Sequence, residues 1–119
     1  MAKIPVTDSE LRELDAWLAE HVFGWTHLGL TRLGALIGHN PETGLPCDIP
    51  KWTEKDFAEV KREIERRGWS WELTCHNRNV ISKCYEFQII GSGYPCRELA
   101  VTEELAGCLA LKAAIKSDY

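Results

Sequence analysis

The sequence contains no apolar run long enough to cross a membrane. A spanning helix needs about 18 or more consecutive apolar residues, and the 119 positions hold no such stretch. The first ten residues, MAKIPVTDSE, also lack the apolar core of a secretion signal. We therefore expect a cytoplasmic protein that has no membrane partner.

Positive charge is in short supply as well. The formal net charge is −4, because the 18 acidic residues outnumber the 14 lysines and arginines. A protein that binds nucleic acid directly needs a basic surface to meet the phosphate backbone, so we expect no direct nucleic-acid partner. The acidic excess is also too small for a protein that imitates DNA.

Paired metal-ligand spacing is missing too. The five cysteines include no C-x-x-C pair, which favours reduced thiols that behave as small buried side chains. The zinc donors that the chain offers follow no paired spacing; they are His39, Cys47, Cys75, His76, Cys84 and Cys96. We expect no metal and no other cofactor.

Catalytic motifs are equally scarce. Gly91-Ser92-Gly93 is followed by no helix, so a turn is favoured over a phosphate-binding loop. A nucleophilic Cys47 with His39 as its base would require that the two side chains meet in space. A cysteine hydrolase or zinc enzyme is therefore the third hypothesis, and we expect a protein that is not an enzyme.

The first and last predicted helices are apolar along their buried sides. Thr7 and Glu10 stand at capping-box spacing, and Gly24 is a natural end for the first helix. Its stripe is Leu11, Leu14, Leu18 and Val22. The last helix starts near Thr102 and is apolar over most of its circumference, so we expect it to be the most buried helix.

The second predicted helix runs from about Glu54 to Arg67. Thr53 supplies its cap, Trp52 an aromatic staple, and Gly68 its end. Phe57, Val60 and Ile64 share one face, whereas the other positions of EKDFAEVKREIERR are almost all charged. A face of mixed charge is typical of a solvated surface, with Glu63 and Arg67 at ion-pair spacing.

A hairpin is predicted after the second helix. In WSWELTCH and VISKCYEFQII the apolar residues occupy odd positions, so the pairing must bring odd positions opposite odd positions. A three-residue loop from Asn77 to Asn79 satisfies this and places Trp71 opposite Tyr85. A third strand follows GSGYP at about Arg97 to Val101.

The segment between the first two helices is too long for a structureless connection. We expect one strand between Trp25 and Ile37, or two strands that turn near Arg32 to Gly34. The resulting order, α-β(β)-α-β-β-β-α, indicates an α+β fold in a single domain, residues 1–119. An antiparallel or mixed sheet of about four to five strands would pack with three helices as a layered helix–sheet sandwich.

Three blocks of the chain resemble the phage ABA-sandwich domain family, a group of small single-domain bacteriophage and prophage proteins. The blocks are LDAWLAEHVFGW, IPKWTEKDFAEV with a following GW, and TEELAGCLALKAAI, in this order along the chain. The chain departs from the family pattern in the longer segment from His27 to Pro46, and in Glu54. The resemblance implies helix–sheet–helix layering and a phage origin, but no characterised activity.

Two functional hypotheses follow. The first is a non-catalytic phage accessory protein that binds and neutralises a host component, such as a bacterial defence factor of the CRISPR–Cas type. The alternative is a homo-oligomeric sponge that sequesters a nucleotide second messenger of host immunity. The candidate binding residues are Trp25, Arg32, His39, Asn40, Glu42 and Trp52, around the turn-rich stretch HNPETG.

Overall fold

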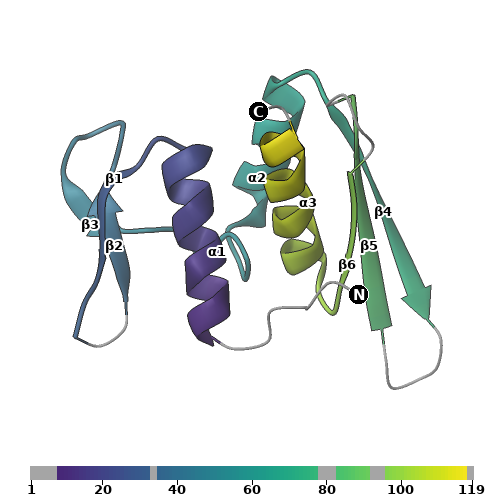
Figure 1. Cartoon of the computed structure of the whole chain (residues 1–119), viewed down its shortest axis with the longest axis horizontal. Helices are drawn as coiled ribbons and strands as arrows, with labels where there is room; N and C mark the ends of the chain where they lie inside the picture. The colour runs from purple at the N-terminus through teal and green to yellow at the C-terminus, as the bar shows by residue number, and fades with distance from the viewer. Residues whose placement is uncertain (1–7, 33–34, 78–82, 92–95, 118–119) are drawn as a thin grey trace. The chain divides into compact units, whose positions relative to one another are not determined.

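A computed structural model of the chain describes residues 8–32, 35–77, 83–91 and 96–117. These residues form three helices and two three-stranded antiparallel sheets, so the protein is an α+β protein (Figure 1). The chain divides into two compact units, Met1–Lys51 and Trp52–Tyr119. The sequence predicts one sheet of four to five strands, and the division into two smaller sheets is the main difference. The single-domain assignment stays a prediction.

The first unit begins with α1 (Asp8–His21), whose buried side contains Leu14 and Leu18, as the apolar spacing predicts. The helix ends where expected, because Gly24 has a φ of 78° and the Trp25 amide donates to the Ala19 carbonyl at 2.8 Å. The predicted cap at Thr7 lies outside the described residues.

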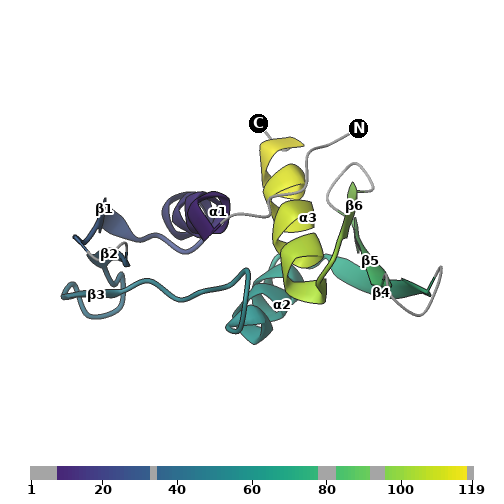
Figure 2. The same ribbon diagram turned by 90° about the horizontal axis from the view of Figure 1, so that it is seen from below.

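The rest of the first unit is a small sheet in the order β1 (Thr26–Leu30), β2 (Leu36–His39) and β3 (Pro46–Asp48). Of the two alternatives for this segment, two strands, β1 and β2, are present, and β2 extends beyond Ile37. The sequence did not predict β3, because its three residues are all exposed and include a proline, so they show no alternation. Figure 2 shows α1 next to β1 and the sheet edge.

The second unit contains α2 (Phe57–Arg66), β4 (Ser70–Asn77), β5 (Lys83–Ile90), β6 (Cys96–Ala100) and α3 (Glu103–Ser117). The helix α3 packs on β5 and β6, and α2 packs on β4 and α3. Both helices lie on the same face of the sheet (Figures 1 and 2). As expected, α3 is buried along most of its length.

The start of α2 differs from the prediction. The helix begins at Phe57 with Asp56 as its N-cap residue, three residues later than expected, and Asp56 makes no side-chain capping hydrogen bond. Thr53 is therefore not the cap. Residues 52–55 form a separate turn, in which Trp52 is fully buried and Thr53 is 3% exposed. The buried face of α2 is as predicted.

The β4–β5 hairpin has the predicted faces but a different register. Trp71 pairs with Ile89, and Leu73 pairs with Phe87, whereas the three-residue loop would place Trp71 opposite Tyr85. Asn77, which the prediction places in the loop, pairs with Lys83, and residues 78–82 between them lie outside the described residues. The observed register differs from the predicted one by an even number of residues. Every apolar side chain therefore stays on the predicted face of the sheet.

An aromatic cluster forms the core of the second unit. The Phe57 ring meets the Phe87 ring edge-on at 5.7 Å between centroids, and the Trp71 ring stacks on Phe87 at 5.5 Å. Gly107 of α3 faces Phe57, and a side chain at this position would overlap the Phe57 ring. The absence of a side chain on α3 thus makes room for the aromatic residue on α2.

Candidate functional site

The structure separates the residues that the sequence suggests as a binding site. Trp25, Arg32, His39, Asn40 and Glu42 belong to the first unit, and Trp52 belongs to the second. The Trp52 side chain is fully buried and its Nε1–H donates to Glu59 Oε1 at 2.5 Å. The structure therefore places Trp52 in the core, where the indole has a partner inside its own unit.

The turn between β2 and β3 is the most exposed part of the candidate set. We call residues 40–45 the tip turn. Its residues 41–45 are exposed, whereas Asn40 is half-buried. The Asn40 side chain accepts a hydrogen bond from the Glu42 amide at 2.8 Å, and the Gly44 amide donates to the Asn40 carbonyl at 2.7 Å. The predicted tight surface turn at HNPETG is confirmed.

Further hydrogen bonds hold the tip turn. The Asn40 amide donates to the Leu45 carbonyl at 3.0 Å, and the Leu45 amide donates to Thr43 Oγ1 at 3.2 Å. Gly44 has a φ of 72°, which only glycine adopts without strain. The Leu45 side chain is 64% exposed. A hydrogen-bonded turn therefore presents one apolar side chain, Leu45, and one carboxylate, Glu42, to solvent.

His39 lies beside a second histidine that sequence analysis did not select. The His27 and His39 rings lie 4.4 Å apart between centroids. His27 has a φ of 55° and sits where the β1–β2 register shifts, between Thr26 and Gly29. A bulge of this kind re-aims a side chain. The sequence pattern does not predict that His27 lies beside His39, because the bulge is a property of the strand pairing.

Trp25 and His27 also line a shallow hollow on the first unit. Its volume is about 390 Å³, and its other lining residues are Glu20, Thr26 and Leu28. Trp25 itself is only 6% exposed. Arg32, by contrast, is exposed at the turn after β1. Among the candidate residues of the first unit, Trp25 lines this hollow, whereas the others lie elsewhere on the small sheet and its turns.

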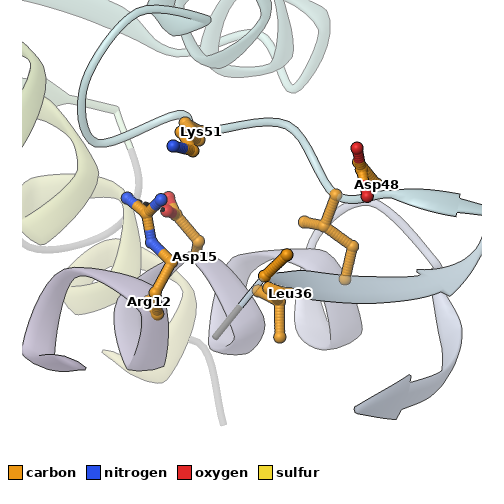
Figure 3. A pocket seen from close by; sticks show the side chains of 7 residues that line it. Arg12, Asp15, Leu36, Asp48 and Lys51 are labelled. Carbon is orange, nitrogen blue, oxygen red and sulfur yellow. Dashed lines mark ion pairs between the residues drawn. The ribbon is translucent and has the colours of Figure 1, made fainter. Parts of the chain in front are cut away.

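A different set of side chains does converge. Within the first unit, a cavity of about 310 Å³ is lined by side chains from α1, from the start of β2 and from the end of β3 (Figure 3). Arg12 Nη2 pairs with Asp15 Oδ2 at 2.9 Å across this cavity wall, and the Asp15 side chain is 1% exposed. The remaining lining residues are Ala35, Leu36, Asp48, Ile49 and Lys51.

Perturbed carboxyl groups lie in the second unit. Burial raises the pKa of Glu63, but hydrogen bonds and charge from Arg66 and Arg67 outweigh burial and leave this pKa below its ordinary value. The Glu63 carboxylate lies 2.6 Å from Arg66 Nη2 and 2.7 Å from Arg67 Nε. Burial on the inner face of β6 raises the pKa of Glu98. Glu63, Arg66 and Arg67 thus form an ion-pair cluster at the C-terminal end of α2. The Glu63–Arg67 ion pair is as predicted.

The opposite face of the β4–β6 sheet is polar at its centre. Glu86 pairs with Arg97 Nε at 2.8 Å and lies 2.8 Å from His76 Nε2. Exposed apolar side chains flank this group; they are Ile90, Leu99 and Val101. The described residues of this face therefore form a surface of mixed polar and apolar side chains.

The described residues contain neither a cluster of metal ligands nor a helix that could span a membrane. Among them, no group of three or more His, Cys, Asp or Glu side chains could hold a metal ion. No helix in the described ranges is long and apolar enough to cross a membrane. Cys75 pairs with Tyr85 and Cys84 with His76, so the two cysteines lie on opposite faces of the sheet, as predicted.

Comparison with protein-family models, with curated proteins and with solved structures finds no match to this chain. The resemblance to the phage ABA-sandwich domain family therefore stays a prediction. A proposal about function therefore rests on the geometry of the chain and on this predicted resemblance.

Proposed function

We propose that the protein is a non-catalytic phage accessory protein that binds and neutralises a host protein with the tip turn of its first unit. The partner would be a bacterial defence factor, such as a CRISPR–Cas effector, in the host cytoplasm. The observation that carries the proposal is the preorganised tip turn, which exposes Leu45 and Glu42. The phage origin and the helix–sheet–helix layering come from the family resemblance.

The geometry of the tip turn suits protein recognition. Ordering a loop during binding costs free energy, and a loop that is already fixed avoids that cost. Four hydrogen bonds described above fix this turn, so Leu45 and Glu42 are held in place before contact. The neighbouring strands add contact area, because β3 is exposed throughout and β1 is exposed at most positions.

The nucleotide sponge has less support from the suggested residues. At the site suggested by the sequence, the base of a nucleotide would stack on an aromatic surface and its phosphates would pair with cations. The Trp52 indole is fully buried and Trp25 is 6% exposed. Neither ring presents a broad face to a base, so Arg32 and His39 would have to hold the ligand without an aromatic platform.

Variants of the tip turn test the proposal. The tagged protein and its Glu42→Arg and Leu45→Asp variants would be incubated with host lysate, and bound proteins would be quantified by mass spectrometry. We expect each variant to lose the partner about tenfold, the effect of removing one central interface contact. Both positions are exposed, so stability should change by less than about 0.5 kcal/mol.

The matched control is Glu72→Arg, a charge reversal at an exposed glutamate of β4 in the second unit. This variant should retain the partner and restore phage growth on defended hosts as well as the unchanged protein does. Equal retention of the partner by the Glu42 and Leu45 variants would refute the tip turn as the interface. No stoichiometric partner, together with unchanged phage growth, would refute the function.

A further inference from the structure

The cavity between α1 and the small sheet has features of a small-molecule site. Its volume of about 310 Å³ reaches the lower end of the range for ligand pockets. Its lining comes from three separate segments of one unit, at residues 12–15, 35–36 and 48–51. None of these residues belongs to the tip turn, so the inference does not depend on the proposed function.

One end of the cavity is cationic. Arg12 and Lys51 both line it, and Figure 3 shows the amine end of Lys51 directed toward the Arg12–Asp15 pair. Asp15 is nine-tenths or more buried and holds the guanidinium by an ion pair at 2.9 Å. A guanidinium fixed in this way can hydrogen-bond an anionic group without first losing its rotamer freedom.

The rest of the cavity is apolar, with an acid at its far side. Leu36 and Ile49 are buried, at 8% and 5% exposure, and contribute apolar wall. Asp48 is exposed and stands apart from Arg12 and Asp15 in Figure 3. From the Arg12–Lys51 end to Asp48, the cavity lining is therefore first cationic, then apolar, then acidic.

We propose that this cavity binds a small organic anion with an apolar body and a hydrogen-bond donor at its other end. The anionic group would lie between Arg12 and Lys51, the body against Leu36 and Ile49, and the donor at Asp48. Both an ω-amino acid, such as 6-aminohexanoate, and a nucleoside monophosphate carry the anionic group and the donor at opposite ends. A bare inorganic anion has only the first of the three features.

Titration of the full chain with three probes tests the site. 6-Aminohexanoate, guanosine monophosphate and inorganic phosphate would be added separately, with calorimetry for affinity and backbone amide NMR for location. At least one organic probe should bind about tenfold or more tightly than phosphate, because it also contacts the apolar wall and Asp48. The amides of Leu36, Ile49 and Lys51 should shift, and the preferred organic probe identifies the source.

Two variants separate the ends of the cavity. Lys51→Ala should weaken the preferred probe about tenfold, whereas Asp48→Asn should weaken it without changing phosphate binding. The control is Lys55→Ala, an exposed lysine outside the cavity, which should bind as the unchanged protein does. Arg12 is left intact because its removal would leave the buried Asp15 carboxylate without its ion pair.

Two results would overturn the proposal. One is that no probe shifts the cavity amides at millimolar concentration. The other is that Lys51→Ala binds the probe as tightly as Lys55→Ala does. Because these titrations use the isolated chain, they give the same answer whether or not the tip turn binds a host protein.

Discussion

Gly107 decides how closely α3 approaches α2. An alanine in a helix is normally more favourable than glycine by about 1 kcal/mol, but here its methyl group would overlap the Phe57 ring. The ring is buried and held edge-on against Phe87, so it has little room to move. We expect Gly107→Ala to lower the free energy of unfolding by about 1–3 kcal/mol, measured by urea denaturation.

A second-site change tests the cause of that loss. Phe57→Leu removes the ring atoms that Gly107→Ala would strike, so the double variant should be less destabilised than the two single losses combined. Additive losses would show that the methyl group acts elsewhere on α3.

Glu63 ties the end of α2 to two arginines. Because the folded-state pKa of Glu63 is depressed, its contribution to stability is fully present above the unfolded pKa and is lost as the pH falls through the folded pKa. Glu63→Gln should cost about 1–3 kcal/mol at pH 7, with a smaller difference from the unchanged protein in strong acid. Chemical denaturation over a pH series measures this, and the exposed helical variant Glu13→Gln serves as the control.

Glu98 should act in the opposite pH direction. Burial raises its folded-state pKa, so its stabilising contribution is complete below the unfolded pKa and is lost as the pH rises through the folded value. Glu98→Gln removes the buried charge and should raise the melting temperature at pH 7. The gain should vanish in acid, where the native carboxyl group is already protonated. A variant that melts at a lower temperature at pH 7 would contradict the role of burial.

At the level of elements, α3 has a side-chain capping hydrogen bond at its N-terminus, whereas the N-cap residue of α2 makes none. Thr102 Oγ1 accepts a hydrogen bond from the Leu105 amide at 3.2 Å. Thr102→Ala should therefore lower the free energy of unfolding by about 1 kcal/mol, and Thr102→Ser should restore most of it. Thermal denaturation of the three proteins is the measurement. Equal stability of the alanine and serine variants would show that the hydroxyl group contributes nothing.

Sequence patterns predict those elements whose periodicity is set locally. The stripe of α1, the buried face of α2 and the parity of the β4–β5 hairpin follow from helical and strand periods. The hairpin register does not, because any even shift keeps Trp71 and Phe87 on the same face. The short strand β3 was missed because it carries no alternating pattern. The start of α2 was placed too early because Thr53 offered a cap three residues before Asp56, which stands at capping-box spacing to Glu59.

At the scale of the molecule, the candidate site shows the same division. The tip turn was predictable because Asn-Pro and Thr-Gly bend the chain through local chemistry. The pairing of His27 with His39 depends on a bulge, and the cavity joins Arg12 to Lys51 across most of the first unit. Residues far apart in the sequence meet there only through the sheet, so no local pattern identifies them.

The distribution of buried apolar side chains predicts how the whole chain responds to division. The first unit contributes Leu14, Leu18, Ala19, Trp25, Leu36 and Ile49, whereas the second contributes all the other buried apolar side chains of the described residues, including its aromatic cluster. A fragment of residues 52–119 is near the lower size limit for independent folding but contains a core of its own.

We therefore expect the fragment 52–119 to unfold cooperatively on heating, and the fragment 1–51 to lack a cooperative transition, as followed by circular dichroism. Within the larger fragment, Gly107→Ala should lower the melting temperature as it does in the full chain, because Phe57 and Phe87 are both present. An unfolded 52–119 fragment would mean that its core needs the first unit, and the chain would then fold as the single domain that its length predicts.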